Sequence, residues 1–545
     1  MFIKERVRLS KPVLSAGQGA GEEARKPVPP PILGEDSPAS QLEGVEAFYR
    51  RMPGIPPLFF EVLGPSGGGW RRQEEVEDLL SPEHLPGKGP EREGRGNIVN
   101  INKTQKPFYN LSQVLRFFMT GFRGGVHPQG LKLTGYKKIE VPPLPPRVVV
   151  PLRQHLGAPC NPLVEKGAQV KTGQKIGDSP APVSAPVHAS LSGTVVELSQ
   201  QRLPTGDKVL SVVIESDGKD EWERMPPLDP EKASREELLQ RVREAGIVGM
   251  GGAGFPTHIK LNPPKKVDTL VVNGVECEPY ITADHRLMLE EGEKIVEGAK
   301  IMAKILGVER VLIAIEDNKP DAIEHMGKLS EGVGEVVRLR TKYPQGDERH
   351  LLKAVLGREV PAGGLPLDVG AVVQNVGTCK AVRDAVLLGE PLVERVVTVT
   401  GEVAEPKNLR VRVGTPFSYL LQQCGGVAGG VRKVVAGGPM MGFAVHEDVP
   451  VVKTTGCVLV MGERQVVKEE EGPCIRCGRC VDACPMGLVP THLVRLVRAK
   501  DFEACLQHNL LSCDECGCCA YVCPSKIPIV HVIREGKKGV RRLKK

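Results

Sequence analysis

The sequence predicts a multidomain protein of the mixed α/β and β class, in which a layer of alternating strands and helices lies between two small β-rich domains and a cysteine-rich helical domain follows. The chain has 545 residues, enough for three or four domains with separate hydrophobic cores. Its 62 glycines and 47 prolines indicate frequent turns and argue against long helical bundles. Ten of its 15 cysteines lie between Cys474 and Cys523, which is typical of metal ligation in a reducing compartment.

Residues 1–118 show no sustained period of 2 or 3.6, and they include a proline cluster at 27–31 and a glycine run at 67–69. We expect this extension to be mostly disordered. The first residues lack the apolar core of a signal peptide, and no run reaches the ~18 apolar residues of a membrane span. The formal net charge of +7 is modest and widely spread, so by itself it says little about nucleic acid. We expect no nucleic-acid partner.

Residues 119–220 carry short β-branched runs, such as Val148–Val150 and Thr194–Val196, that glycine and proline interrupt. This pattern predicts a small β-barrel. The segments GAQVKTGQKIG and SAPVHASLSGTVVEL resemble the barrel-sandwich domains that carry a lipoyl or biotinyl group on a lysine at a hairpin tip. The corresponding tip here, Asp178–Pro182, has no lysine, so we expect a structural role.

Between residues 234 and 392, strands alternate with helices, which predicts an α/β layer. Ser234 is a candidate helix cap before the apolar residues Leu238, Leu239 and Val242. We expect, in order, a helix at 234–245, a strand at 269–272, a helix at 293–306, a strand at 311–315 and a helix from about Lys319.

Residues 393–462 return to alternating β-branched runs with Gly-Gly and Gly-Pro turns, which predicts a second small β domain. Residues 468–535 form the cysteine-rich domain, with a helical stretch expected around 492–506. We expect residues 536–545 to form a basic tail. It is either a solvated disordered end or a segment that docks to anionic lipid or an acidic partner, at ~1 kcal/mol per basic residue near a membrane.

The cysteines of the C-terminal domain follow the spacing Cys-x-x-Cys-x-x-Cys-x-x-x-Cys-Pro twice. This spacing is typical of [4Fe-4S] ligation, and in two-cluster ferredoxins the fourth cysteine of each run serves the other cluster. A pair of zinc sites is the alternative, although zinc is usually held by two separated Cys-x-x-Cys knuckles. We therefore expect two [4Fe-4S] clusters, one held by Cys474, Cys477, Cys480 and Cys523, and the other by Cys513, Cys516, Cys519 and Cys484.

Residues 249–254 satisfy the pattern G-x-G-x-x-G, but they follow an expected helix and not a strand, so a Rossmann fingerprint is not indicated. A tight packing loop is one interpretation. The other is a phosphate site formed by loop amides and a nearby lysine at a helix start, with Gly249, Gly251, Gly252, Gly254 and Lys260 as candidates.

This loop and the segment NGVECEPYITADHRLM, residues 273–288, resemble the flavin-binding subunit of respiratory NADH dehydrogenases. Asn273, Glu276, Glu278 and Pro279 match a segment that holds FMN and meets NADH in that subunit. With YPQGDERHLL, GREVPAGGLPLDVGAVVQNVGT, VAGGPMMG and the cysteine spacing added, residues 119–535 resemble the RnfC family, one component of the Rnf ion-translocating electron transport complex. His285 and Asp347 depart from that family's pattern, which usually has an acid and a glycine there.

The resemblance implies a barrel-sandwich hybrid, an FMN/NADH-dehydrogenase-type α/β domain, a β-grasp domain of the SLBB type and a two-cluster ferredoxin-like domain. It implies hydride transfer from NADH to FMN, followed by single-electron transfer through the clusters. Lys260 and the glycine amides would hold the FMN phosphate, while Glu276 and Glu278 would orient flavin and nicotinamide. Asn375 and Thr378 would close the far side of the pocket.

The resemblance further implies a peripheral subunit at the cytoplasmic face of the cell membrane. Its partners would be NADH, ferredoxin, and the integral-membrane and flavin-carrying subunits of an Rnf-type complex, and its activity would be that of an NADH-linked oxidoreductase coupled to ion translocation. Two alternatives stay open. A soluble cobalamin reductase of the same superfamily would pass electrons to a corrin, and a flavin-less module would only relay electrons between redox proteins.

Overall fold

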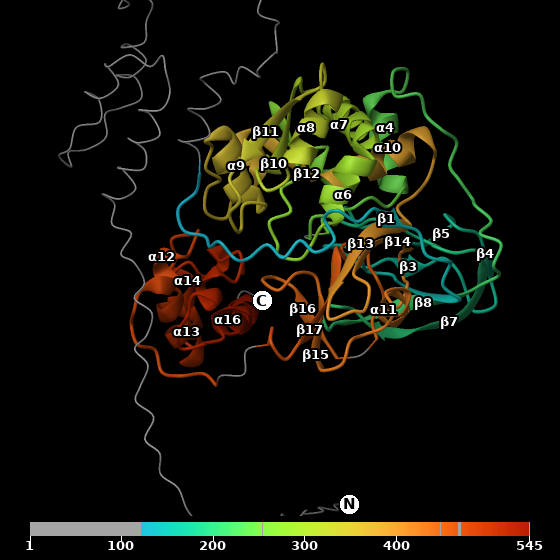
Figure 1. Ribbon diagram of the computed structural model, residues 1–545. Coiled ribbons are helices and arrows are strands. Elements are labelled where there is room, and N and C mark those ends of the chain that lie inside the picture. The colour runs from blue at the N-terminus through green and yellow to red at the C-terminus, as the bar shows by residue number, and fades with distance from the viewer. Residues whose placement is uncertain (1–120, 253, 447, 467–469, 544–545) are drawn as a thin grey trace, which may run out of the picture. The chain divides into compact units, whose positions relative to one another are not determined.

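The computed structural model describes residues 121–543 except residues 253, 447 and 467–469. The extension expected at residues 1–118 lies outside the described residues. The described residues form two small sheets, a parallel sheet covered by helices, a mixed sheet and a group of short helices near the C-terminus (Figure 1). No described helix is long and apolar enough to cross a membrane.

The first β domain encloses one hydrophobic core between two small sheets, with strand orders β2–β8–β7–β4 and β3–β5–β6. Val148, Val150 and Ile214 are fully buried, because alternate side chains of β2 and β8 point into this core. At the tip, Asp178 forms ion pairs with Lys175 and Arg243 and so has a structural role. The strands are β2 (Arg147–Pro151), β3 (Asn161–Pro162), β4 (Gln169–Val170), β5 (Lys175–Asp178), β6 (Val187–His188), β7 (Gly193–Arg202) and β8 (Lys208–Ser216).

The α/β domain is built on a parallel sheet of order β11–β10–β9–β12. Leu270 and Val272 pack against one group of helices, and Val271 packs against α9 on the opposite face. The strands are β9 (Thr269–Asn273), β10 (Arg310–Glu316), β11 (Glu335–Leu339) and β12 (Ala371–Asn375). The helices are α4 (Arg235–Glu244), α5 (Thr257–Lys260), α6 (Ala283–Glu290), α7 (Gly292–Leu306), α8 (Pro320–Leu329), α9 (Glu348–Leu356), η3 (Pro366–Val369) and α10 (Val376–Leu387).

The elements predicted for this domain are all present to within a few residues. Helix α4 begins where expected because Ser234 and Glu237 form a capping box, each side chain accepting a hydrogen bond from the other's backbone amide. The glycine loop follows α4 and precedes the short helix α5, so it is a helix-to-helix connection.

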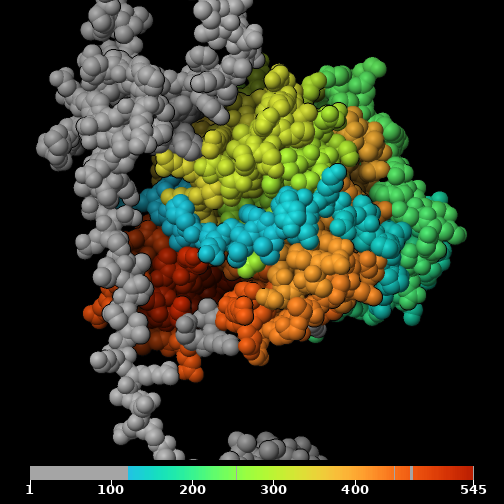
Figure 2. All heavy atoms as spheres, in the orientation of Figure 1, coloured from blue at the N-terminus to red at the C-terminus, as the bar shows by residue number. Residues whose placement is uncertain are grey.

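The second β domain is a mixed sheet of order β1–β14–β13–β17–β15–β16. Its edge strand β1 (Ile139–Glu140) belongs to an N-terminal strap, residues 121–140, that runs along the surface between the α/β domain and the mixed sheet (Figure 2). The other elements are β13 (Glu394–Gly401), β14 (Lys407–Arg412), α11 (Phe417–Gln423), β15 (Val431–Ala436), β16 (Phe443–Val445) and β17 (Cys457–Gly462).

The cysteine-rich domain contains α12 (Arg479–Asp482), α13 (Pro490–Arg498), α14 (Phe502–Gln507), η4 (Leu510–Ser512), α15 (Cys518–Tyr521) and α16 (Ile529–Leu543). It differs from expectation in two places. The helical stretch around 492–506 is two helices, because Lys500 has a left-handed φ of 59° that ends α13. The basic tail is helical as far as Leu543, and its Lys537 is buried and donates to the carbonyl of Cys513 at 2.6 Å. Lys544 and Lys545 lie outside the described residues.

Helices α7 and α10 pack so closely that a Cβ at Gly298 would overlap the carbonyl oxygen of Cys379. We expect Gly298→Ala to lower the free energy of unfolding by about 1–3 kcal/mol, because one helix must shift to admit the methyl group. Gly327→Ala in α8 is the matched control, since a Cβ there would meet nothing within 4 Å. Denaturant unfolding of both variants tests this, and equal stabilities would contradict the close helix contact.

Candidate functional site

The parallel sheet brings two candidate residues together at its carboxyl edge. Strands β9 and β12 pair in register, so their last residues, Asn273 and Asn375, are direct neighbours. The chain continues from β9 to β10 on one side while β12 lies on the other, which makes this edge the switch point of the sheet. Open α/β sheets bind nucleotides and related ligands in the crevice at such a switch point.

The glycine loop lies against the same edge. The amide of Met250 donates to the hydroxyl of Thr378 at 3.0 Å, and a Cβ at Gly251 would lie 3.5 Å from the Cβ of Asn375. The amide of Gly254 donates to the carbonyl of Gly249 at 3.1 Å, so the loop closes on itself. The loop thus meets Asn375 and Thr378 through Gly251 and Met250, although more than 120 residues separate them in the sequence. Gly254 instead lies near Gln154, His155 and Thr454.

One buried side chain at this edge supports the presence of a polar ligand. Gln374 is 2% exposed, and neither atom of its side-chain amide has a hydrogen-bond partner among the described residues. An unpaired buried polar group costs about 1–3 kcal/mol. The edge of a flavin ring carries both donors and acceptors, so the residues present at this edge of the sheet fit such a cofactor.

Among the described residues of the glycine loop, none contacts the side chain of Lys260. Its ammonium group pairs with Glu348 at the start of α9, and the helix that carries it is only four residues long. Asn273 shapes the turn after β9: its side-chain nitrogen donates to the carbonyl of Gly346 at 2.8 Å, and its oxygen accepts from the amide of Val275 at 3.2 Å.

The two candidate glutamates bind backbone amides of the chain itself. Glu276 accepts from the amides of Asp284 at 2.7 Å and His285 at 3.3 Å, and so fixes the start of α6. Glu278 accepts from the amide of Met441 at 2.8 Å and joins the α/β domain to the loop after β15. Burial raises the pKa of Glu278 to about 7, although these amide contacts oppose the shift.

Two lysines that the sequence analysis missed donate hydrogen bonds to the backbone carbonyls of residues 275–281. Lys132, on the N-terminal strap, donates to the carbonyls of Glu276 at 2.8 Å, Glu278 at 2.9 Å and Ile281 at 2.7 Å. Lys319 donates to the carbonyl of Val275 at 2.7 Å. Burial lowers the pKa of Lys132, and the carboxylate of Glu276 opposes this shift. No local pattern marks either lysine, because their partners lie far away in the sequence.

Residues 343–350 connect the carboxyl edge of the parallel sheet to the cysteine-rich domain. The Tyr343 hydroxyl donates to the carbonyl of Cys516 at 2.7 Å, and the amide of Gly346 donates to the thiol of Cys277 at 3.3 Å. Asp347 caps α9 by accepting from the amide of Arg349 at 3.0 Å. Among the described residues, Asp347 therefore serves as the N-cap of α9. The nearby His350 lies 3.5 Å from the carboxylate of Asp514.

The eight candidate cysteines lie in two groups of four. Cys474, Cys477 and Cys480 line one cavity of about 400 Å³, and the fourth cysteine in its wall is Cys523, from the second motif. We call these four the outer set, because Cys474 and Cys477 are exposed. Four thiols that converge on one cavity fit a [4Fe-4S] cluster.

The other four cysteines, the inner set, are Cys484, Cys513, Cys516 and Cys519. Burial raises the pKa of the Cys513 thiol to about 11, and the neighbouring Cys516 and Cys484 raise it further. Burial likewise raises the pKa values of Cys484 and Cys519, with Cys516 adding to both shifts. Two of these thiols, those of Cys516 and Cys519, are buried, and the other two are half-buried. Four thiols this close together form thiolates readily only around a cationic centre, which is the chemistry of a metal-ligand set.

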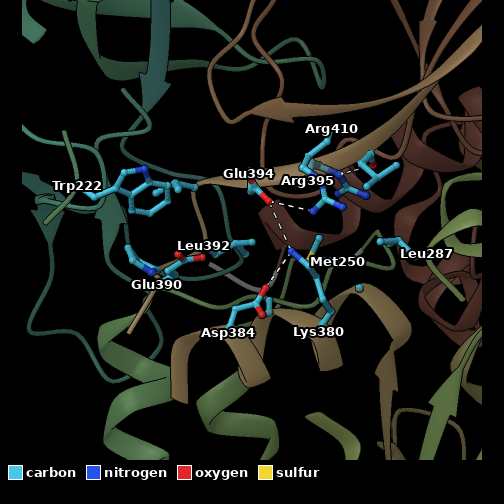
Figure 3. Close-up of a pocket in the computed structure, with 15 residues that line it drawn as sticks. Trp222, Met250, Leu287, Lys380, Asp384, Glu390, Leu392, Glu394, Arg395 and Arg410 are labelled. Atoms are coloured by element: carbon cyan, nitrogen blue, oxygen red, sulfur yellow. Dashed lines mark hydrogen bonds and ion pairs between the residues drawn. The ribbon is translucent and has the colours of Figure 1, made fainter. Parts of the chain in front are cut away.

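A second cavity borders the glycine loop but is lined by ion pairs (Figure 3). Lys380 lies between Asp384 at 2.9 Å and Glu394 at 3.5 Å, and Arg410 pairs with Glu394 at 3.1 Å. The cavity measures about 40 Å³, which is far too small for a flavin. We interpret it as packing between α10 and the mixed sheet.

Lys132→Met should release the segment at 276–281, because three carbonyls lose a charged donor, at about 1.5–3 kcal/mol for such a bond. We expect faster amide hydrogen exchange in this segment and lower flavin occupancy, with the iron content unchanged. Lys138→Met is the control, since Lys138 lies six residues along the same strap and is exposed. We call the contacts of Lys132 and Lys319 with the carbonyls of residues 275–281 the lysine clamp. Unchanged amide hydrogen exchange at 276–281 in the Lys132 variant would contradict it.

Cys523→Ser should damage the outer cluster, with loss of about half the iron, and spare the inner cluster. Cys505→Ser in α14 is the control, because Cys505 is buried but belongs to neither set. Iron analysis and electron paramagnetic resonance of the reduced protein distinguish the two clusters. A perturbation confined to the cluster of Cys513, Cys516 and Cys519 would reverse the assignment.

Comparison with protein families places four domains along the chain. The models matched are the RnfC barrel sandwich hybrid domain at residues 120–219, the Nuo51 FMN-binding domain at 242–384, the SLBB domain at 396–444 and the 4Fe-4S dicluster domain at 473–527. The FMN and the two [4Fe-4S] clusters expected from the sequence are thus confirmed as cofactors. The individual residues that bind them stay predictions.

Curated relatives extend over most of the chain. The C subunit of the proton-translocating ferredoxin:NAD(+) oxidoreductase complex of Clostridium ljungdahlii is 51% identical over 404 residues, which cover 72% of this chain and 88% of the relative. The C subunit of the Na(+)-translocating ferredoxin:NAD(+) oxidoreductase complex of Acetobacterium woodii is 43% identical, with 77% and 97% covered. The C subunit of the ion-translocating oxidoreductase complex of Rhodobacter capsulatus is 44% identical, with 71% and 77% covered. These identities, together with the RnfC domain at its N-terminal side, show that the chain belongs to the RnfC family of Rnf complex subunits.

Proposed function

We propose that this chain is the electron-input subunit of an Rnf-type ion-translocating oxidoreductase, passing electrons between NADH and partner subunits or ferredoxin. Relatives are named as subunits of ferredoxin:NAD(+) oxidoreductases that translocate protons or sodium ions. The observation that carries the proposal is the segment 343–346: its Gly346 contacts Asn273 and Cys277 at and after the end of β9, and its Tyr343 contacts Cys516 of the inner set. One short segment thus joins a flavin-type crevice to a cluster site.

FMN supplies the step between NADH, which gives two electrons as a hydride, and clusters that each carry one electron. The chain must bind and orient this cofactor. The glycine loop and the ends of β9 and β12 border the crevice, and the Thr378 hydroxyl fixes the loop through the amide of Met250. We assign cofactor binding to Gly249, Gly251, Gly252, Gly254, Asn273, Asn375 and Thr378.

Glu276 and Glu278 act in this proposal as positioning residues. Their oxygens are engaged by backbone amides at the start of α6 and in the loop at 440–441, so they set the shape of the crevice wall. In this proposal the ammonium group of Lys260 leaves the carboxylate of Glu348 and binds the flavin phosphate instead. Such an exchange of partners by a partly exposed ion pair costs little.

The two cysteine sets take different places in this scheme. The inner set lies beside Tyr343 and is largely buried, whereas the outer set opens at the surface. The inner set therefore faces the flavin side and the outer set faces the partner.

The remaining assignments concern the second β domain and the location of the chain. We infer that the mixed sheet with α11 is a β-grasp domain, which the SLBB match at residues 396–444 supports. We also infer that the chain is a peripheral subunit at the cytoplasmic face of the membrane, beside integral-membrane and flavin-carrying subunits. The names of the relatives as members of ion-translocating complexes support this location.

The test is anaerobic purification followed by analysis of flavin, iron and sulfide and by NADH oxidation with ferricyanide. We expect flavin, two clusters and NADH oxidation. Extensive reduction of ferredoxin should require membranes that carry the partners. Low-potential ferredoxins have reduction potentials of about −400 mV, and each ~59 mV uphill lowers the equilibrium constant of a one-electron transfer by a factor of ten. A chain without flavin would be only an electron relay, and NADH-driven corrin reduction would favour a cobalamin reductase.

A further inference from the structure

The surface above the outer set is open and positively charged. Cys474 and Cys477 are exposed, and the residue after Cys474, Ile475, is 65% exposed. The charged side chains in the wall of the cavity are three arginines and one glutamate, which are Arg476, Arg495, Arg498 and Glu471. We call the three arginines and Ile475 the outer rim.

The internal repeat of the cysteine motif shows what this position does in the inner set. Asp514 and Glu515 follow Cys513 as Ile475 and Arg476 follow Cys474. Within the chain, Asp514 lies 3.5 Å from Arg349 and from His350. Glu515 pairs with Arg534 and Lys537, each at 2.8 Å. At the inner set, therefore, the two residues after the first cysteine form a charged contact surface that other parts of the chain cover.

The equivalent surface at the outer set has no such cover among the described residues. Arg476 and Glu515 share the same left-handed backbone, with φ of 57° at both, so the two loops present their side chains from the same conformation. No carboxylate in the described part of the chain lies within ion-pair distance of Arg476 or Arg495. Arg498 pairs with Glu471 at 2.6 Å, and exposed pairs of this kind contribute little.

We propose that the outer rim is the docking surface for the carboxylate-rich face of a one-electron redox partner protein. The proposal rests on the proposed function, because it places electron exit at the outer set. The inner loop is acidic and meets basic side chains of this chain, and the outer loop is basic and apolar and meets an acidic partner in the same way. Ile475 supplies an apolar contact beside the cysteines, and the arginines steer the partner.

The arginines have another physical explanation that the test must separate. Arg495 and Arg498 lie in the last turn of α13, where cations interact favourably with the helix dipole. Arg476 and Arg495 also lie close enough to Cys474 to lower the pKa of its thiol. Arginines with only that role would set the reduction potential of the outer cluster without affecting association. A steering surface instead changes the rate of association, and its effect weakens with salt.

The decisive variant is the pair Arg495→Glu and Arg498→Glu, with Arg476→Glu added as a triple variant. Arg495 and Arg498 lie on α13, outside the loop that carries the cysteine ligands. The double variant therefore leaves that loop unchanged and can still be tested if the triple variant loses iron. Lys166→Glu reverses an exposed charge on the first β domain and is the control. Each full-length protein is mixed with washed membranes that contain the other subunits but lack this chain, over a range of salt concentrations. Sedimentation measures binding, and NADH-driven reduction of the membrane subunits measures electron transfer.

We expect binding of the wild-type chain to weaken with salt, and the Arg495/Arg498 pair to bind at least about tenfold more weakly at low salt. The Lys166 control should bind as the wild type does. NADH oxidation by hexaammineruthenium, a cationic acceptor, should not fall in the pair, because the reversed charges attract this acceptor. Failure of the proposed function would show differently, as absent flavin or absent NADH oxidation in the wild-type chain.

Three results would overturn the proposal. The first is wild-type binding by a variant that retains full iron. The second is a shift of the outer cluster's potential with unchanged binding, which would make the arginines tuning groups. The third is equal, rim-dependent binding to protein-free vesicles of anionic lipid, which would make a membrane surface the occupant.

Discussion

Two lysine ammonium groups determine the shape of the segment on which the two cofactor regions depend. Lys132 and Lys319 donate to four carbonyls between Val275 and Ile281. Glu276 and Tyr280 in this segment have left-handed φ values of 47° and 70°, a conformation that costs non-glycine residues about 1–2 kcal/mol each. The charged hydrogen bonds offset this cost. Because the segment is held in this form, Glu276 reaches α6, Cys277 reaches Gly346 and Glu278 reaches the mixed sheet.

The lysine clamp also explains why the N-terminal strap contributes to the candidate flavin site. The strap crosses the surface, adds the edge strand β1 to the mixed sheet and contributes Lys132 to the crevice wall. Near its start, the amide of Gly125 donates to the carbonyl of Ala483, next to the inner cysteine Cys484. The strap thus contacts the flavin region, the mixed sheet and the cysteine-rich domain.

Local patterns predicted what local physics determines. Alternation and capping placed α4, β9, α7 and β10, and the repeated cysteine spacing predicted the grouping of Cys523 with the first motif. Contacts across long sequence separations were out of reach: nothing near Lys132 indicates three carbonyls about 145 residues away. For Lys260 a local pattern suggested a partner that the fold replaces. Its position after a glycine loop suggests a bound phosphate, whereas in the folded chain its ammonium group forms an ion pair with Glu348. The tail was misjudged because its charge was counted without the apolar face that packs α16 against its neighbours.

The crossing of the two motifs has a consequence for how the protein is made. Each cysteine set takes at least one member from the other motif, so neither set is complete until the second motif has left the ribosome. Lys537 then reaches back from α16 to the Cys513 carbonyl. The earlier domains have their own hydrophobic cores and can fold while these residues are still being synthesised. If the crossed sets hold the clusters, neither cluster can be completed before the last motif has emerged, by which point every earlier domain is free to fold.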